Sequence, residues 1–287
     1  MPAKVWIDGA PVDAQEARVP VFDRGFLYGD SVYEVLRTFS WKPFALGPHL
    51  DRLQRSAAAL GMHLPPRSDI ERAIADTLAA ANEPDAYVRV IVTRGAGELG
   101  LDPALADAPR LIVIVRPVKL PDPAQYRDGV EVAVVGRSRS AAPGQPGALD
   151  PQVKSGNYLV SVLAVAEARR RGAYEAILTD AVGRITEGGS SNFFLVRGGR
   201  ISTPPVSAGL LEGITRGQVI AAARASGLFV DELPLWPADL HHADEAFLTS
   251  SVRGLLPIVR VDGQPLGGGV PGPITKKVMA LYDALTG

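Results

Sequence analysis

Lys154 is the residue whose type and position most directly suggest covalent chemistry. Only six of the 30 lysine and arginine residues are lysines, and no other lysine lies between residues 120 and 275. Lys154 stands between a loop rich in Pro and Gly and a predicted helix. Desolvation at such a place favours the neutral amine, which can attack a carbonyl. Judged by its position alone, Lys154 is more often expected to be a solvated loop lysine than a nucleophile.

Glu187 begins the second candidate segment. It is followed by two glycines, by three small polar residues at 190–192, and then by an apolar strand. Glycines let the backbone approach a ligand closely, and neighbouring hydroxyls can orient a carboxylate. A polar hairpin explains this segment equally well when it is read alone.

Two further segments have the composition of phosphate sites. Gly213, Ile214 and Thr215 open a predicted helix, and N-terminal helix amides together with a hydroxyl can bind phosphate. Ser250 and Ser251 lie in a hydroxyl-rich turn that ends a strand. Each pattern is weak alone, because ordinary helix starts and turns often have this composition.

The four segments together supply what pyridoxal 5'-phosphate (PLP) requires of a protein. The cofactor needs a lysine for a Schiff base, an acidic partner for its pyridine nitrogen, and donors for its phosphate. Lys154, Glu187 and the two phosphate segments match these needs in turn. PLP is therefore the expected cofactor.

The same segments resemble the class IV (fold-type IV) aminotransferases, and the resemblance spans nearly the whole chain. This family contains branched-chain aminotransferases, D-amino acid transaminases, (R)-amine transaminases and aminodeoxychorismate lyases. The matching segments are 22–25, 29–30, 49–53, 154–158, 187–193, 213–216 and 244–245. The resemblance implies a PLP-dependent transaminase with two domains, a small N-terminal α/β domain and a larger C-terminal mixed β-domain with helices.

The resemblance also implies roles for individual residues. Lys154 would form the internal aldimine and shuttle the proton between the substrate Cα and the cofactor, and Glu187 would keep the pyridine nitrogen protonated. Tyr158 would hydrogen-bond the phenolate oxygen, and Leu211 would pack on the ring. The expected phosphate ligands are Arg52, Ile214, Thr215, Ser250 and Ser251. Family members are homodimers with a shared active site, so a homodimer is expected here.

Several segments favour a D-amino acid as amino donor. The short lysine-to-asparagine spacing in 154–157, the serine-rich segment 187–192, the turn 249–251 and the segment 29–35 all resemble D-type enzymes. The Tyr-x-Arg motif at 87–89 instead matches branched-chain enzymes, and the D-type Arg-x-His carboxylate trap is missing. The prediction is a D-amino acid transaminase with an atypical carboxylate site, acting with 2-oxoglutarate or pyruvate. Branched-chain, broad L-amino acid or (R)-amine transamination is the alternative, and aminodeoxychorismate lyase activity ranks third.

Another cation must hold the substrate carboxylate if the Arg-x-His trap is absent. An arginine can pair with a carboxylate through two parallel hydrogen bonds. The candidate substrate-binding residues are Tyr33, Arg37, Arg89, Arg94 and Arg253. Arg253 is the least family-like residue in its turn, so it is the first candidate. For each arginine the alternative is a surface or structural ion pair.

The composition argues against several other classes of function. With 30 basic and 31 acidic side chains, the net charge of -1 gives no electrostatic reason to expect nucleic acid or an anionic membrane as partner. The chain has no cysteine and its four histidines form no i,i+4 pair, so no metal site is expected. No apolar run approaches the roughly 18 residues of a membrane span. A cytoplasmic globular protein is therefore expected.

Alternating strand and helix patterns must position these residues. β-Branched and apolar runs predict strands at 4–8, 32–39, 87–93, 110–118, 130–135, 174–179, around 185, 193–196 and 245–249. Apolar stripes predict helices at 49–60, 158–171 and 214–226. Ser68 and Glu71 indicate a capping box that opens a further helix to Ala81. The fold class is therefore α+β or α/β.

The prolines between residues 116 and 123 predict the boundary between two domains. An N-terminal domain (1–117) is followed by a linker (118–125) and by a C-terminal PLP-binding domain (126–287). Residues 141–151, rich in Pro, Gly and Ala, are expected to form a long loop that leads to Lys154.

Overall fold

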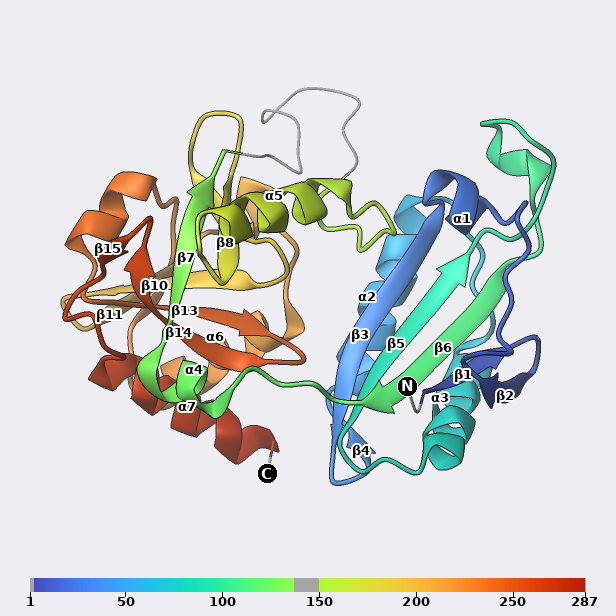
Figure 1. The fold of residues 1–287 in the computed structure, drawn as a ribbon, viewed down its shortest axis with the longest axis horizontal. Helices are drawn as coiled ribbons and strands as arrows, with labels where there is room; N and C mark the ends of the chain where they lie inside the picture. The colour runs from blue at the N-terminus through green and yellow to red at the C-terminus, as the bar shows by residue number, and fades with distance from the viewer. Residues whose placement is uncertain (1–2, 137–149, 287) are drawn as a thin grey trace. The chain divides into compact units, whose positions relative to one another are not determined.

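The computed structural model describes residues 3–136 and 150–286 and divides the chain into two compact units. The first unit comprises Met1–Lys119 and Val153–Asn157, and the second comprises Leu120–Gln152 and Tyr158–Gly287. Figure 1 shows the fold of each unit. No helix among the described residues combines the length and apolar character needed to cross a membrane.

The division after Lys119 falls inside the segment 118–125, which the sequence predicts as a linker. Helix α4 (Pro123–Asp128) begins within the same segment, where Asp122 accepts a hydrogen bond from the Ala124 amide and caps the helix. Val153–Asn157 belong to the first unit, although the sequence-based boundaries place them in the C-terminal domain 126–287. Most of the predicted loop 141–151 lies outside the described residues.

The first unit is built on a six-stranded sheet with the order β2-β1-β6-β5-β3-β4, in which all neighbours pair antiparallel. Along β5, fully buried and half-buried side chains alternate, as expected when the two faces of a strand meet different surroundings. The strands are β1 (Lys4–Ile7), β2 (Ala10–Asp13), β3 (Ser31–Phe39), β4 (Lys42–Pro43), β5 (Ala86–Thr93) and β6 (Arg110–Pro117).

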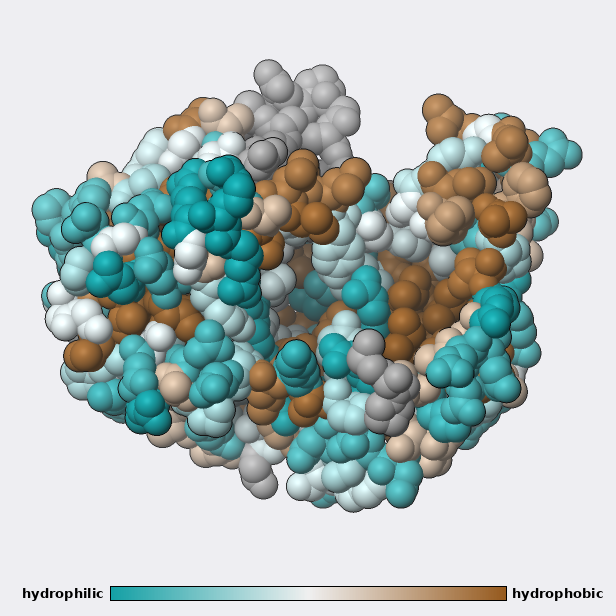
Figure 2. All heavy atoms as spheres, viewed as in Figure 1, coloured by the Kyte–Doolittle hydropathy of each residue, from teal (hydrophilic) through white to brown (hydrophobic). Residues whose placement is uncertain are grey.

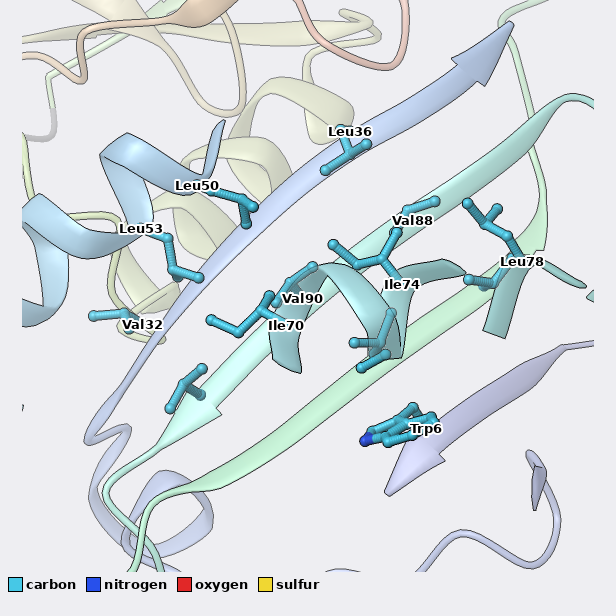
Figure 3. Packing of buried hydrophobic residues seen from close by; sticks show 14 of the residues in the cluster. Trp6, Val32, Leu36, Leu50, Leu53, Ile70, Ile74, Leu78, Val88 and Val90 are labelled. Carbon is cyan, nitrogen blue, oxygen red and sulfur yellow. The ribbon is translucent and has the colours of Figure 1, made fainter. Parts of the chain in front are cut away.

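Helices α2 (Leu46–Ala59) and α3 (Arg67–Ala81) pack on one face of this sheet, and their apolar side chains form a single core with the strands. Figure 3 shows this core and labels Trp6, Val32, Leu36, Leu50, Leu53, Ile70, Ile74, Leu78, Val88 and Val90. The predicted capping box is wrong. Helix α3 begins at Arg67, after Pro66 and without a side-chain cap, so Ser68 already lies inside the helix.

The second unit is built on a nine-stranded mixed sheet with the order β12-β11-β10-β13-β14-β7-β8-β9, and β15 pairs with β14. The parallel pairs are β7 with β8, β7 with β14, and β11 with β12. The strands are β7 (Val130–Val135), β8 (Glu175–Thr179), β9 (Ile185–Gly188), β10 (Asn192–Arg197), β11 (Arg200–Thr203), β12 (Val230–Glu232), β13 (Glu245–Ser250), β14 (Gly254–Val261) and β15 (Gln264–Pro265).

The helices of the second unit are α4, α5 (Leu159–Arg170), α6 (Ile214–Ala225) and α7 (Pro273–Thr286). Ala164 and Ala168 of α5 pack against Ala133 and Ala176 of the sheet, and these small residues let the helix lie close to β7 and β8. β14 and α7 are the longest of the elements that the sequence patterns do not predict. Pro257 lies within β14 and weakens the sequence signal for a strand. The short helices are α1 (Arg24–Tyr28), η1 (Pro103–Leu105), η2 (Val206–Ala208) and η3 (Pro237–His242).

Three polar side chains are buried between β3 and α2. The two carboxylate oxygens of Glu34 accept hydrogen bonds from Nε and Nη2 of Arg52 at 2.7 and 2.8 Å, and Nδ1 of His49 lies 2.7 Å from Glu34 Oε2. Burial by itself would raise the pKa of Glu34, but Arg52 and His49 outweigh it and lower the pKa to about 2. Burial lowers the pKa of His49. The ionised Glu34 therefore fixes the charged Arg52.

Replacing Glu34 with Gln should remove a pH-dependent part of the folding stability. The Glu34 pKa is lowered from 4.5 to about 2, so its contribution is present above pH 4.5 and is lost as the pH falls toward 2. At 1.36 kcal/mol per pKa unit, the shift corresponds to about 3 kcal/mol. Urea unfolding should therefore show that wild type is more stable than Glu34→Gln above pH 4.5. This difference in the free energy of unfolding should shrink as the pH falls from 4.5 toward 2. A difference that stays constant down to about pH 3 would contradict the ionised pair.

Candidate active site

Lys154 is held by backbone hydrogen bonds against strand β3 of the first unit. The Tyr33 amide donates to the Lys154 carbonyl at 3.0 Å, and the Lys154 amide donates to Ser56 Oγ of α2 at 3.1 Å. The Gly156 amide donates to the Ser31 carbonyl at 2.9 Å. These bonds attach the 153–157 segment to the sheet as a short extra partner of β3, and Lys154 itself is half-buried.

Gly156 is needed for this close approach. A Cβ at that position would lie 2.4 Å from Ser31 Oγ, which is shorter than any ordinary contact. Gly156 therefore permits the backbone contact with β3. In the sequence, Gly156 is recognisable only as part of the family motif 154–158.

The side chains of Tyr33, Arg89 and Lys154 come together in the first unit. Lys154 Nζ lies 4.5 Å from the centre of the Tyr33 ring, and the Arg89 guanidinium carbon also lies 4.5 Å from it. In the β3–β5 register Tyr33 pairs with Ile91, so Arg89 is its diagonal neighbour on the same face. Val32 and Glu34 project to the opposite face, toward α2. The structure thus places two predicted site residues, Lys154 and Arg89, against the ring of a third, Tyr33.

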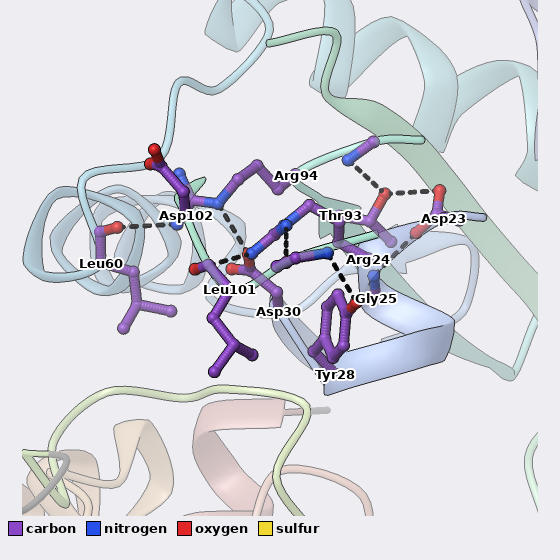
Figure 4. A network of polar contacts seen from close by, with 12 residues as sticks. Asp23, Arg24, Gly25, Tyr28, Asp30, Leu60, Thr93, Arg94, Leu101 and Asp102 are labelled. Carbon is purple, nitrogen blue, oxygen red and sulfur yellow. Dashed lines mark hydrogen bonds and ion pairs between the residues drawn. The ribbon is translucent and has the colours of Figure 1, made fainter. Parts of the chain in front are cut away.

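Arg94 is engaged in a polar network that Figure 4 shows. Its Nε donates to Asp30 Oδ2 at 2.7 Å, and its terminal nitrogens donate to the carbonyls of Leu60 and Gly61. Arg24 donates to the same Asp30 oxygen at 3.0 Å. Burial raises the pKa of Asp30, but the two arginines outweigh it and lower the pKa below its ordinary value. These contacts give Arg94 a structural role.

Arg37 contacts other residues of the first unit. Its guanidinium carbon lies 4.1 Å from the centre of the Phe39 ring, and Nη2 lies 3.9 Å from Asp85 Oδ1. The Arg89 guanidinium, by contrast, lies against the same Tyr33 ring that the Lys154 amine contacts.

Glu187 and Leu211 come together in the second unit. Glu187 lies on β9 and its side chain is buried, and its Oε2 accepts a hydrogen bond from the Leu211 amide at 3.2 Å. Asn192 Nδ2 donates to the Leu211 carbonyl at 2.9 Å. A Cβ on Gly213 would lie 1.9 Å from Asn192 Oδ1, so this position requires glycine. Asn192 has no role in the sequence analysis, although it ends the motif that contains Glu187.

Helix α6 begins directly after Gly213. Gly213 is its N-cap and supplies no side-chain cap, while Thr215 is buried in the first turn. N-terminal amides of this kind suit an anion such as phosphate. Tyr158 is the N-cap residue of α5, and Ser250 ends β13. The predicted phosphate residues of this unit thus lie at the ends of secondary-structure elements.

Two buried hydroxyls of this unit fit a polar ligand. Ser191 Oγ and Thr249 Oγ1 are buried and have no hydrogen-bond partner within residues 3–136 and 150–286. Ser191 follows the Glu187 turn, and Thr249 pairs with Asn192 between β10 and β13. A buried hydroxyl is normally hydrogen-bonded. The residues of this unit therefore fit a cofactor with a charged nitrogen and a phosphate, and the sequence analysis assigns no individual role to Ser191 or Thr249.

Arg253 is bound within the protein. Its Nη1 lies 2.9 Å from Glu175 Oε2, its Nη2 donates to Ser190 Oγ at 3.0 Å, and its Nε donates to Ser250 Oγ at 3.2 Å. The sequence analysis places Arg253 on the substrate carboxylate, and this geometry favours another role. Within the described residues, no group of three or more His, Cys, Asp and Glu side chains could hold a metal ion.

A family model, relatives in sequence and solved structures all indicate the same family. The model of the family "Amino-transferase class IV" matches residues 31–261. The chain is 40% identical over 276 residues to a putative branched-chain-amino-acid aminotransferase of Methanocaldococcus jannaschii, covering 96% of this chain and 93% of the relative. It is 32% identical over 284 residues to a D-alanine aminotransferase of Bacillus licheniformis, covering 98% and 97%.

Solved structures agree with the sequence comparison. The branched-chain amino acid aminotransferase of Escherichia coli superposes with a TM-score of 0.93 at 30% identity, covering 99% of this chain and 94% of that one. The branched-chain aminotransferase of the thermophilic archaeon Thermoproteus uzoniensis, solved with norvaline, gives a TM-score of 0.88 at 33% identity, with coverage of 98% and 93%. The expected two-domain, fold-type IV class is confirmed. The chain belongs to the class IV aminotransferase family.

Proposed function

We propose that this aminotransferase moves an amino group between an amino acid and a 2-oxo acid, with PLP attached to Lys154. The observation that carries the proposal is the placement of Lys154. Its backbone is attached to β3, and its amine lies over the Tyr33 ring, which Arg89 also contacts. A lysine amine on a fixed main chain can condense with the aldehyde of PLP.

PLP supplies an aldehyde that condenses with amines and a pyridinium ring that withdraws electrons. Glu187 is the residue proposed to hold the ring nitrogen in its protonated form. The bond from the Leu211 amide orients its carboxylate, and Leu211 is the residue proposed to pack on the ring. Tyr158 is proposed to bind the phenolate oxygen. The proposed phosphate ligands are Arg52, Ile214, Thr215, Ser250 and Ser251.

Lys154 has a second proposed task, which is to carry the proton that leaves the substrate Cα. Its main chain is fixed at both the amide and the carbonyl, so only the side chain needs to move during this transfer. Arg89 is proposed to hold a substrate carboxylate, because its guanidinium contacts the same Tyr33 ring as the Lys154 amine.

A D-amino acid is the donor proposed from the motifs. The supporting features are the short spacing in 154–157 and the serine-rich segments 187–192 and 249–251. The relative from B. licheniformis, a D-alanine aminotransferase, aligns over almost the whole chain. The amino acceptor is proposed to be 2-oxoglutarate or pyruvate.

A branched-chain L-amino acid is the second candidate donor, and specific observations favour it. The Tyr-x-Arg motif at 87–89 is of the branched-chain type, and its arginine contacts the Tyr33 ring, as Lys154 does. The relative from M. jannaschii, at 40% identity, is a putative branched-chain enzyme. No observation on the described residues favours the (R)-amine or lyase alternatives.

The first unit also presents an apolar surface that supports the proposal of a homodimer. Figure 2 shows apolar side chains exposed over α1 and the loop that follows β5. Arg24 of α1 donates to the carbonyls of Gly100 and Leu101, so the helix and the loop form one continuous surface. Its large exposed side chains are Val21, Phe22, Phe26, Leu99 and Leu101. An apolar patch of this kind is typical of an interaction site, and a second copy of the chain is the proposed partner.

Lys154→Ala should abolish transamination while leaving the fold intact. The loss should be at least about a thousandfold, because proton transfer by a positioned base contributes on that scale. The measurement is turnover together with the visible absorbance of the PLP-loaded protein, and Lys119→Ala is the matched control because it removes a lysine at the unit boundary. Retained turnover in the Lys154 variant would assign the attachment to another residue.

The donor is decided by single-turnover reactions of the PLP-loaded protein with D-alanine and L-leucine in parallel. The D-amino acid proposal expects the visible absorbance to fall with D-alanine at least about tenfold faster than with L-leucine, equal to about 1.4 kcal/mol of barrier. Reaction with L-leucine alone would replace the D-amino acid proposal by the branched-chain one. The lyase alternative expects neither amino acid to react.

Phe26→Asp combined with Leu101→Asp should convert a dimer into a monomer. The two side chains are 71% and 83% exposed in the single chain, so a charge is tolerated there unless a partner covers it. Sedimentation should give about twice 30.3 kDa for wild type and 30.3 kDa for the variant. Val270→Asp, at a 64% exposed position of the second unit, is the control and should stay dimeric. A monomeric wild type would refute the proposal.

A further inference from the structure

Arg253 lies in the three-residue turn between β13 and β14, where Ser250 pairs with Gly254. Its carbonyl accepts a hydrogen bond from the Tyr126 hydroxyl of α4 at 2.8 Å. Its side chain is 18% exposed, and the Glu175 side chain that it meets is 3% exposed. Both the main chain and the side chain of Arg253 are thus tied to other elements of the second unit.

The guanidinium binds two separate turns at once. Toward its own turn, Nε donates to Ser250 Oγ at 3.2 Å. Toward the turn between β9 and β10, Nη2 donates to Ser190 Oγ at 3.0 Å and to the Ser190 carbonyl at 3.3 Å. Each nitrogen of the planar fork therefore has an acceptor, because Nη1 binds Glu175.

Glu175 completes the connection from the start of β8. Its Oε2 accepts from both Arg253 Nη1 at 2.9 Å and Ser190 Oγ at 3.1 Å. A Cβ on Gly189 would lie 2.8 Å from Glu175 Oε1, so the carboxylate packs directly on the glycine that follows Gly188. The turn after Glu187 therefore contacts both Glu175 and Arg253, which are also paired with each other.

We propose that Arg253 is a positioning residue that joins the turn after Glu187 to the turn carrying Ser250 and Ser251, with Glu175 and Ser190 as its partners. The inference rests on the proposed function, in which Glu187, directly before the first turn, holds the cofactor's ring nitrogen and the second turn holds its phosphate. Two anchor points of one rigid cofactor need a fixed separation. The guanidinium supplies it, because its fork geometry is planar and rigid.

This role differs from direct binding of a substrate carboxylate. Four of the five guanidinium N–H groups already donate to Ser250, Glu175 and Ser190, so a carboxylate could pair with the guanidinium through two parallel hydrogen bonds only by displacing one of these partners. The positioning role requires no such exchange. It acts on affinity for PLP, whereas carboxylate binding would act on affinity for the amino acid.

The test compares Arg253→Met and Arg253→Lys with wild type. The first readout is the dissociation constant for PLP, and the second is amide hydrogen exchange of segments 186–192 and 249–254 in the PLP-free protein. The third is the amino acid concentration that gives half-maximal rate at saturating PLP. Arg200→Met is the matched control, since it breaks an exposed arginine–aspartate pair with Asp231 in the same unit.

Arg253→Met should weaken PLP binding by roughly ten- to a hundredfold, the scale of lost hydrogen bonds to a charged group. Both segments should exchange faster together, Arg253→Lys should recover part of the affinity, and half-saturation by the amino acid should change by less than about twofold. Arg200→Met should match wild type in every readout, because exposed pairs contribute little.

Removing Arg253 alone leaves Glu175 as a buried, unpaired carboxylate, which can prevent folding. Arg253→Met with Glu175→Gln removes both charges, and this folded variant should still bind PLP weakly. Unchanged PLP affinity with a large rise in half-saturation would instead assign Arg253 to the substrate. If wild type itself binds no PLP, the proposed function fails. If wild type and the variants bind PLP equally well, only the positioning role fails.

Discussion

Strand β3 is the element on which the chemistry of the first unit depends, because its two faces and its backbone each hold a different group. Glu34 points to the helix side and fixes Arg52, whereas Tyr33 points to the other side and contacts Lys154 and Arg89. The backbone of the same strand binds the main chain of Lys154. A register shift of one residue would exchange the two faces and separate all of these contacts.

In the second unit, the candidate site residues lie on or next to short turns, and side-chain hydrogen bonds hold these turns in place. Glu187 and Leu211 share a hydrogen bond, Asn192 holds the other side of Leu211, and helix α6 starts soon after Leu211. Arg253 and Glu175 then brace the turn that follows Glu187. Buried polar groups cost free energy unless they are fully paired, so this network specifies one arrangement of the turns.

The sequence predicts the elements and the reactive residues better than the contacts among them. Periodic apolar patterns indicate β3, β5 and most helices to within a few residues, and the segments around Lys154 and Glu187 carry the family resemblance. The partners of Arg253 cannot be predicted in this way, because Glu175 and Ser190 are 78 and 63 residues distant along the chain. A local pattern also fails at α3, where Pro66 starts the helix before the expected cap at Ser68.

The proposed function requires a covalent bond between PLP and Lys154, and reduction with borohydride tests that bond most directly. Borohydride converts the lysine–PLP imine into a stable amine, which proteolysis and mass spectrometry then locate. A phosphopyridoxyl group is expected on the peptide that contains Lys154. None is expected on the peptides that contain Lys4, Lys42, Lys119, Lys276 or Lys277. A label on any of those lysines with Lys154 unmodified, or no label at all, would contradict the proposed function.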